Sequence, residues 1–306
     1  MSWIIRPTPP YDFPLSVSLF SSGDPQIRAF RKGHLTQLVR SDGRYLLADL
    51  SGSGTLNKPL LSLALQSETY REPDAAEVRR VKETIAAILN LRLDLTMFYE
   101  AVSRDPILTG ITSRLYGLKT PRTQTVFEAL VDSIIEQQIS IRVARSLRER
   151  LIREFGEQVT IQGRTYYAFP DFPALAAGTD ERFRSCGMSR RKGEYIRGVA
   201  EKISEGSLNL EQYRTVRDTG HIIEELCEIR GIGRWTAELT VLRSLGRLDA
   251  VPADDLGIRR VIGRYYGNGT IVTGDEARRI AEQWGIWKGL AAFYLITAEM
   301  QGIPPA

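Results

Sequence analysis

The sequence predicts a mainly α-helical protein with an N-terminal α+β domain. Up to about residue 90, short segments alternate apolar and polar residues, which indicates β-strands, and one amphipathic helix follows them. From Thr96 onward, apolar residues recur every three or four positions almost throughout, which is the period of helices. The 306 residues are enough for two domains. We place an N-terminal α+β domain at 1–95 and a helical region at 96–306, and we expect the helical region to form two packed subdomains.

The first domain contains four segments that read as strands and one helix. The third strand follows Ser41-Asp42-Gly43, a sequence typical of hairpin turns. Asp74 and Glu77 resemble a capping box, so a helix should start there, with apolar residues spaced three and four apart as far as Leu89. The predicted strands are 16–20, 34–40, 45–50 and 60–66.

Prolines and loop glycines divide the second region into helices of ordinary length. A single strand is expected at 160–169, between two of these helices. We see no internal repeat and no low-complexity linker, so the two regions should pack against each other. The predicted helices are 126–137, 141–155, 180–184, 190–205, 210–229, 234–245, 255–266, 275–284 and 288–301.

The composition excludes several classes of protein. No apolar run approaches the roughly 20 residues of a membrane span, and the start lacks the long apolar core of a secretory signal. We therefore expect a cytoplasmic protein without membrane contact. The two cysteines, Cys186 and Cys227, cannot supply four thiolates to an iron–sulfur cluster, and His34 and His221 lack ligand-like spacing. We expect no cofactor and no metal bound by side chains. A net charge of +4 is only weak support for a nucleic-acid partner.

The most informative stretch is a predicted helical hairpin at about 226–245. Its two helices are joined by Arg230-Gly231-Ile232-Gly233, where the glycines allow a sharp turn and the close approach of another molecule. The second helix starts at about Arg234, so its first amides lack partners within the helix and suit a phosphate. A tight loop with a glycine cap is the purely structural interpretation of the same residues.

A pair of carboxylates follows the hairpin at Asp254 and Asp255. Pro252 ends the preceding segment, and Asp254 is well placed to cap the next helix. In one interpretation, both aspartates only stabilise the helix N-terminus through capping and the helix dipole. In the other, the free amides and the dipole stabilise a negative charge that serves to stabilise a cation or to orient water. A hairpin that binds a backbone phosphate, followed by one such carboxylate, is what cleavage of a sugar–base bond requires.

These residues closely resemble the helix-hairpin-helix DNA glycosylase superfamily, and within it the alkylbase branch of 3-methyladenine DNA glycosylases. The resemblance implies the helix-hairpin-helix glycosylase fold. It also implies a monofunctional glycosylase of base excision repair that hydrolyses the N-glycosidic bond of a flipped alkylated purine in double-stranded DNA. The matching segments are 127–130, 135–140, 186–196, 226–239 and 255–260.

The resemblance also implies roles for individual residues. Asp255 matches the catalytic aspartate, and Asp254 is the alternative because the register is ambiguous by one residue. Trp235 matches a tryptophan of the base pocket, whereas Trp284 and Trp287 are expected in the core. The family has further pocket aromatics where this chain carries Leu239, Leu256 and Ile296. Tyr11 and Phe13 are candidates for a pocket wall from the first domain.

Further matches concern the DNA partner, which we expect to be double-stranded and to contain damaged bases. Gln138 matches the wedge that fills the gap left by a flipped base. We expect the chain to act as a monomer. Residues expected to contact DNA are Arg230, Gly231, Ile232, Gly233, Arg234, Thr236, Gln138, Arg190, Arg191 and Lys192.

Two other functions stay open on the sequence alone. One is a bifunctional glycosylase and lyase for oxidised purines, but such enzymes carry a nucleophilic lysine where this chain has Trp235. The other is a non-catalytic protein that binds DNA or lesions on the same fold, because fold does not fix function. The iron–sulfur glycosylases are excluded by the cysteine count.

Overall fold

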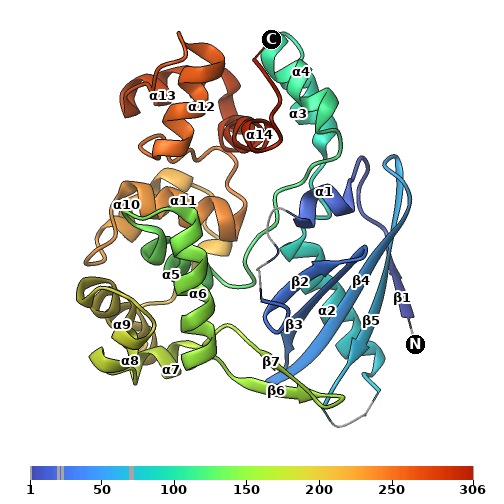
Figure 1. Cartoon of the computed structure of the whole chain (residues 1–306), viewed down its shortest axis with the longest axis vertical. Coiled ribbons are helices and arrows are strands. Elements are labelled where there is room, and N and C mark those ends of the chain that lie inside the picture. The colour runs from blue at the N-terminus through green and yellow to red at the C-terminus, as the bar shows by residue number, and fades with distance from the viewer. Residues whose placement is uncertain (1, 19–20, 22–23, 69–71, 306) are drawn as a thin grey trace.

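The computed structural model of the chain describes residues 2–18, 21, 24–68 and 72–305. Its N-terminal part is a five-stranded antiparallel sheet in the order β1-β5-β4-β3-β2 (Figure 1). Between β3 and β4, Asp42 and Gly43 both have positive φ, as a two-residue hairpin turn requires. The strands are β1 (Ser2–Ile5), β2 (Arg28–Arg31), β3 (His34–Ser41), β4 (Arg44–Thr55) and β5 (Lys58–Gln66).

The prediction of a strand at 16–20 was wrong. The described part of this segment belongs to the short helix α1 (Phe13–Ser18), while residues 19–20 lie outside the described residues. The Asp12 carboxylate accepts a hydrogen bond from Leu15 N, at 2.9 Å, and this local capping favours a helical turn over an extended chain. The predicted helix at Asp74 is confirmed as α2 (Ala75–Ile88), with the Asp74 side chain accepting from Glu77 N.

Each predicted helix of the second region has a counterpart in the structure, which also has helices at 95–101, 106–114 and 172–176 that the sequence analysis did not list. Four of the helices that begin at the predicted residue do so because a Ser or Thr side chain caps the first turn of each of them. The helices are α3 (Leu95–Ala101), α4 (Pro106–Arg114), α5 (Val126–Glu136), α6 (Ile141–Phe155), α7 (Phe172–Ala176), α8 (Asp180–Ser185), α9 (Arg190–Ser204), α10 (Thr219–Cys227), α11 (Arg234–Leu245), α12 (Leu256–Tyr266), α13 (Gly274–Ala281) and α14 (Lys288–Met300).

Three predicted segments differ from the structure. The strand at 160–169 is a hairpin of β6 (Gln158–Ile161) and β7 (Arg164–Tyr167), because Gln162 and Gly163 both take positive φ. The helix at 210–229 divides into the 3-10 helix η1 (Leu210–Arg214) and α10, which Asp218 caps. The helix at 275–284 ends as α13 at Ala281, and the 3-10 helix η2 (Glu282–Trp287) continues to a kink at Gly285.

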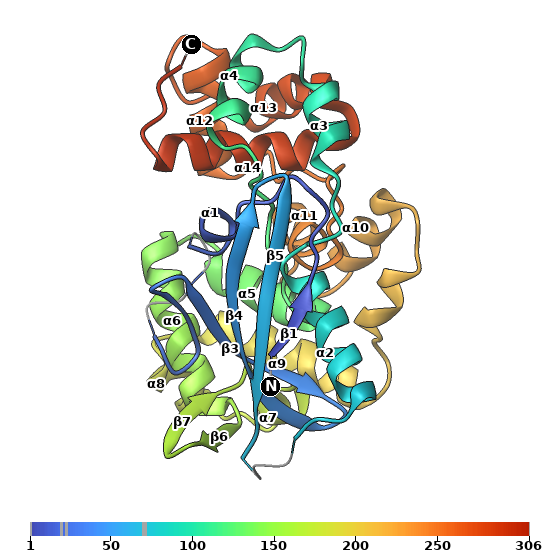
Figure 2. The ribbon, with the colours of Figure 1, turned by 90° about the vertical axis from the view of Figure 1, so that its right-hand side faces the viewer.

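Three large hydrophobic cores organise the described residues, and a small fourth cluster joins the sheet to the β6–β7 hairpin through Leu47, Val159 and Ile161. One lies between the N-terminal sheet and α2, a second joins α5, α6, α9, α10 and α11, and a third joins α3 and α4 to α12 and α14. Figure 2 shows the helices of the third core gathered at one end of the molecule, beyond the sheet. Trp284 and Trp287 pack in this third core, as predicted. The boundary between residues 95 and 96 stays a prediction; the core of the N-terminal elements extends to Leu91, and Leu95 already belongs to the third core.

In the described part of the chain, no helix is both long and apolar enough to cross a membrane.

Candidate active site

The predicted hairpin is formed by α10 and α11, and its two glycines differ in their surroundings. Gly231 has a φ of +89°, and a Cβ atom there would lie inside the ring of Tyr195. Gly233 caps α11, is exposed, and has open space where a Cβ would point. The side chain of Ile232 is buried in the second hydrophobic core, which joins α5, α6, α9, α10 and α11. Gly231 is therefore required by the fold, whereas Gly233 leaves the backbone accessible from outside.

The N-terminus of α11 presents unpaired amides. The first helical hydrogen bond of α11 runs from Ala237 N to Gly233 O, at 3.0 Å, so the amides of residues 234–236 lie before it. The Thr236 side chain is buried and accepts a hydrogen bond from Gln137, so of Thr236 only the backbone amide is left for an outside ligand. Such a helix N-terminus suits an anion such as a phosphate.

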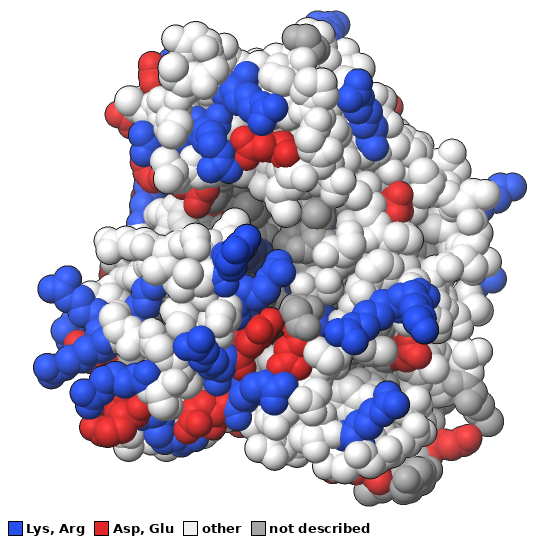
Figure 3. All heavy atoms as spheres, in the orientation of Figure 1, with Lys and Arg blue, Asp and Glu red and all other residues white. Residues whose placement is uncertain are grey.

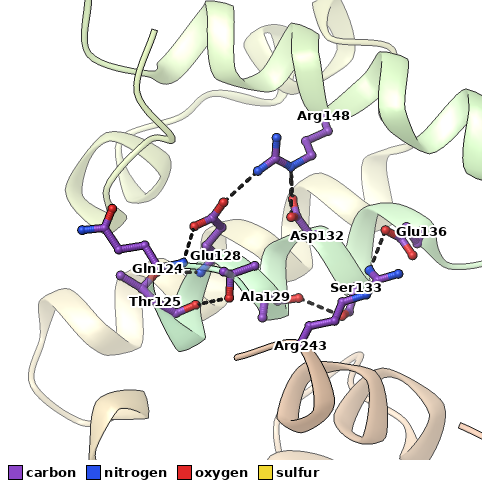
Figure 4. Close-up of polar contacts among 10 residues, drawn as sticks. Gln124, Thr125, Glu128, Ala129, Asp132, Ser133, Glu136, Arg148 and Arg243 are labelled. Carbon is purple, nitrogen blue, oxygen red and sulfur yellow. Dashed lines mark hydrogen bonds and ion pairs between the residues drawn. The ribbon is translucent and has the colours of Figure 1, made fainter. Parts of the chain in front are cut away.

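Gln137 holds the hairpin against the end of α5. Its Nε2 donates to the carbonyl of Gly231 and to the hydroxyl of Thr236, both at 3.0 Å. Nearby, Arg243 on α11 forms an ion pair with Glu136 on α5 at 2.7 Å (Figure 4). The end of α5 and the hairpin therefore form one braced unit. The sequence carries no signal for these contacts of Gln137, Glu136 and Arg243, because only the fold brings the end of α5 to the hairpin.

The predicted wedge residue lies at the exposed tip of this unit. Gln138 follows Gln137 directly, is exposed, and has a φ of +57°, which is uncommon for a residue other than glycine. Ser140 then caps α6. The strained conformation is fixed by the braced Gln137 on one side and by the capped helix on the other. Gln138 is thus placed to project from the surface, as a wedge must.

The predicted basic residues divide into exposed and anchored ones. Arg190, Arg191, Arg230 and Arg234 are exposed. Arg190 and Arg230 share Glu194 as an ion-pair partner, and Arg234 pairs with Glu238. The prediction that Lys192 contacts DNA is not supported by its position. Its Nζ donates a hydrogen bond to the carbonyl of Ile135 at 2.7 Å, so this side chain connects α9 to α5 and does not extend into solvent. Burial lowers the pKa of Lys192.

Asp255 is held by two hydrogen bonds from different elements. As the cap of α12, its Oδ1 accepts from the amide of Ile258, at 3.1 Å. Its Oδ2 accepts from the indole Nε1 of Trp235 on α11, also at 3.1 Å. A Cβ at Gly257 would lie 2.9 Å from Oδ1, so the glycine leaves room beside the carboxylate. The structure therefore joins the tryptophan and the aspartate that the sequence singled out separately.

The Asp254 side chain points away from Trp235 and toward α13. Its side chain is 59% exposed and lies 3.5 Å from Arg278 on α13, which also pairs with the buried Glu238. Asp254 thus faces the C-terminal helices, while Asp255 faces the hairpin helix. This geometry favours Asp255 as the functional carboxylate, although the register stays a prediction.

The walls near Asp255 are partly apolar. Leu239 lies one turn after Trp235 on the same face of α11 and is buried, whereas Leu256 is 59% exposed. The Ile296 side chain lies beside Gly257, since a Cβ there would be 3.4 Å from Ile296 Cδ1. These residues can border a pocket whose aromatic surface comes from Trp235.

Tyr11 and Phe13 do not fit the predicted pocket wall. They are only 2% and 4% exposed and belong to the core between the sheet and α2. Phe13 packs edge-on against Phe30, with ring centroids 5.8 Å apart. The sequence signal was misleading because aromatic residues near a domain start fill a core as readily as they line a pocket. The prediction that Tyr11 and Phe13 form a pocket wall is therefore wrong.

Two arginines, Arg243 and Arg260, lie within electrostatic range of the Asp255 carboxylate. The hydrogen bond to Glu299 raises the pKa of Arg260, and the charges of Glu299 and Asp255 add smaller contributions. Figure 3 shows a hollow between the upper part of the molecule, which contains α12–α14, and the lower left part, which contains α5–α11; Lys and Arg side chains lie along its edge, with some Asp and Glu side chains among them. Among the described residues, no group of three His, Cys, Asp or Glu side chains could hold a metal ion.

Known proteins resemble this chain in sequence and in fold. The chain is 33% identical to a DNA-3-methyladenine glycosylase of Bacillus subtilis over 202 residues, which are 66% of this chain and 66% of that protein. The match therefore spans just under two thirds of that relative. The structure of a 3-methyladenine DNA glycosylase from Archaeoglobus fulgidus is similar with a TM-score of 0.86, at 29% identity and covering 98% of both chains.

A further structural relative extends the comparison. A Schizosaccharomyces pombe 3-methyladenine DNA glycosylase, solved in complex with abasic DNA, matches with a TM-score of 0.58 and 25% identity, covering 67% of this chain and 97% of that one. The family model for HhH-GPD superfamily base excision DNA repair proteins matches residues 131–285, which contain the hairpin, Trp235 and Asp255. The chain therefore belongs to the HhH-GPD superfamily of base excision DNA repair proteins.

Proposed function

We propose that the protein is a monofunctional DNA glycosylase that removes alkylated purines from double-stranded DNA by hydrolysis. The observation that carries the proposal is the hydrogen bond between Trp235 and Asp255 beside the hairpin. Family membership and the names of the relatives support it. We further propose that the chain acts as a monomer in the cytoplasm or nucleoid and that its partner is duplex DNA with damaged bases.

The proposed reaction starts with extrusion of the damaged base. A base inside the duplex cannot be reached, so it has to leave the stack while Gln138 fills the gap. The amides of residues 234–236 and the exposed arginines would bind phosphates near the lesion. Such contacts make binding dependent on salt and independent of sequence.

Bond cleavage then depends on charge. An alkylated purine is cationic and leaves readily, so it needs little help from a general acid. The indole face of Trp235 can stack on this electron-poor base through a cation–π interaction. Asp255, oriented by Trp235 and by the α12 amide, would stabilise the positive charge that develops on the sugar and position the attacking water.

The proposal is tested by excision from a panel of duplexes that each carry one defined lesion. We expect release of alkylated purines such as 3-methyladenine or 7-methylguanine, and little or no release of 8-oxoguanine. The products are separated on a gel after alkaline cleavage of abasic sites. Binding to lesion DNA without release of any base would instead favour the non-catalytic alternative.

Replacing Trp235 by phenylalanine should slow base release by roughly tenfold to hundredfold, because a hydrogen bond to a charged group contributes about 1.5–3 kcal/mol. The phenyl ring keeps an aromatic face but cannot donate to Asp255. Single-turnover rates on lesion DNA measure the effect. Trp284→Phe is the matched control, since it removes an indole hydrogen bond to Asp105 in the C-terminal core and should leave base release unchanged. Equal rates for wild type and Trp235→Phe would contradict the orienting role.

We expect the product to be an intact strand with an abasic site. Strand cleavage needs an amine that forms a Schiff base with the sugar, and the indole of Trp235 is not basic. Lys192 and Lys288 donate to Ile135 O and to Glu282. Burial lowers the pKa of Lys119 to about 8, but this side chain is 0% exposed and bonds two carbonyls. Borohydride treatment should trap no covalent complex, and nicking without alkali should not accompany base release. A trapped adduct would contradict this prediction and would favour a bifunctional glycosylase and lyase.

A further inference from the structure

The hairpin helix and the helix that Asp255 caps belong to different hydrophobic cores. α11 packs in the second core with α5 and α10, whereas α12 and α13 pack in the third. Figure 1 shows these two groups of helices one above the other. Apolar packing within each core does not fix where Asp255 lies relative to the hairpin, so contacts between the two groups have to contribute.

A buried carboxylate on α11 makes such a contact. Glu238 is 1% exposed, and its Oε1 accepts hydrogen bonds from Arg234 Nε at 2.9 Å and from Arg278 Nη1 at 2.7 Å. Arg234 is the first residue of α11, whereas Arg278 comes from α13. A charge inside a protein needs a partner of opposite sign, and removing one member of a buried pair is unfavourable. The ion pair of Glu238 and Arg278 therefore ties the hairpin helix to α13.

The start of α13 is fitted in turn to the start of α12. Gly274, the first residue of α13, lies so close to Asp254 that a Cβ atom there would overlap the carboxylate. Arg259 on α12 donates from Nε to the carbonyl of Val272, at 2.7 Å, just before α13. Asp255 lies between Asp254 and Arg259 in the sequence. A shift of α13 relative to α11 would therefore move Asp255 as well.

Two contacts from one face of α11 thus hold the segment that contains Asp255. Trp235 and Glu238 are three residues apart, which places them on the same face of the helix. Trp235 donates to Asp255 itself, and Glu238 binds α13 through Arg278. A single hydrogen bond allows rotation about itself, whereas a second contact one turn further along the helix prevents it.

We propose that Glu238 and Arg278 are positioning residues for base release: their ion pair holds α12 and α13 against the hairpin helix, so that Asp255 faces the sugar next to the phosphate bound at the hairpin. This inference rests on the function proposed above. The contact between Glu238 and Arg234 uses Nε, and the Arg234 side chain is 62% exposed, so its terminal nitrogens can still reach a phosphate. The ion pair therefore serves the rate of base release and not the affinity for DNA.

Glu238→Gln tests this separation of rate from affinity. The amide has no charge and only one acceptor oxygen, so it cannot hold both arginines as the carboxylate does. Single-turnover base release should slow by roughly tenfold to hundredfold, because a misplacement of about 1 Å can cost a reaction about hundredfold. Affinity for the same lesion duplex should stay equal or rise, since a negative charge beside Arg234 is lost. A variant that is only less stable loses rate and affinity together.

Arg278→Met removes the other partner of the ion pair, at a position that is only partly buried. Base release should slow to a similar extent. The double variant Glu238→Gln/Arg278→Met should be no slower than the slower single variant, because both changes break the same contact. Effects that multiply in the double variant would contradict a role of the pair.

Glu128→Gln is the matched control. Glu128 is also a buried carboxylate with an arginine at 2.7 Å, but its partner Arg148 lies on α6, within the second core (Figure 4). Breaking this pair should lower the melting temperature and leave base release by the folded protein unchanged. All rates are measured at a temperature at which circular dichroism shows each variant to be folded.

Hydrogen exchange of the free protein adds a measurement that does not depend on catalysis. The amides of residues 256–262 and 275–281 should exchange severalfold faster in Glu238→Gln and Arg278→Met, and as in wild type in Glu128→Gln. Wild-type rates of base release in Glu238→Gln, equal losses of rate and affinity there, or unchanged exchange would each overturn the proposal. If the wild-type protein releases no base, the proposed function fails instead, and the exchange comparison still shows whether the ion pair holds α12 and α13 in place.

Discussion

Replacing Asp255 by asparagine should lower the rate of base release by about 10²- to 10⁴-fold, the range expected when a catalytic carboxylate is lost. The amide keeps the shape of the side chain and an oxygen that can cap α12, but it has no charge to stabilise the sugar cation. Affinity for lesion DNA should survive, because the hairpin and the exposed arginines are unchanged. Single-turnover excision and a binding titration on the same duplex measure the two effects.

Asp254→Asn is the matched control for this prediction. Asp254 is exposed and lies beside Arg278, so its loss removes one surface ion pair, which contributes at most about 1 kcal/mol. Base release should change by less than about tenfold. If Asp254→Asn abolishes base release while Asp255→Asn retains it, the catalytic register is shifted by one residue.

Gly231→Val should destabilise the protein by about 2–5 kcal/mol. The φ of +89° disfavours any side chain at Gly231, and the new atoms would overlap the Tyr195 ring. The sequence alone predicts that both hairpin glycines allow the close approach of DNA. The structure assigns the two glycines different roles, since only Gly233 has open space around its missing Cβ. Chemical denaturation of Gly231→Val measures the loss of stability.

Gly233→Val tests DNA binding without the large loss of stability expected for Gly231→Val. Its backbone is extended, which valine adopts readily, so the free energy of unfolding should fall by no more than about 1 kcal/mol. Affinity for damaged and for undamaged duplexes should fall together, by roughly tenfold or more, because the side chain covers the amides of residues 234–236. Unchanged affinity in a folded Gly233→Val protein would remove the hairpin from the DNA interface.

Local signals in the sequence were sufficient for most of the helical region. The predicted boundaries of α6 and α11 agree with the structure, because the residues that cap these helices or end them are neighbours in sequence. The cap of α12 was predicted one residue too early: the sequence favoured Asp254, but it is the Asp255 side chain that accepts a hydrogen bond from the amide of Ile258. The short segments were less predictable: 16–20 alternates like a strand, but the Asp12 side chain stabilises a helical turn there.

The sequence by itself determined the fold class, the family resemblance and the identity of the residues that carry the proposed chemistry. Only the tertiary structure decided which of them meet. Trp235 and Asp255 are 20 positions apart, and Gln137 lies 94 positions before Gly231, yet each pair is joined by a hydrogen bond. Tyr11 and Phe13, which the sequence suggested for the pocket, lie in the core, and Lys192, which it suggested for DNA binding, forms a contact between two helices. The physical reason is that capping and periodicity act within a few residues, whereas burial and long-range hydrogen bonds depend on how complete helices pack together.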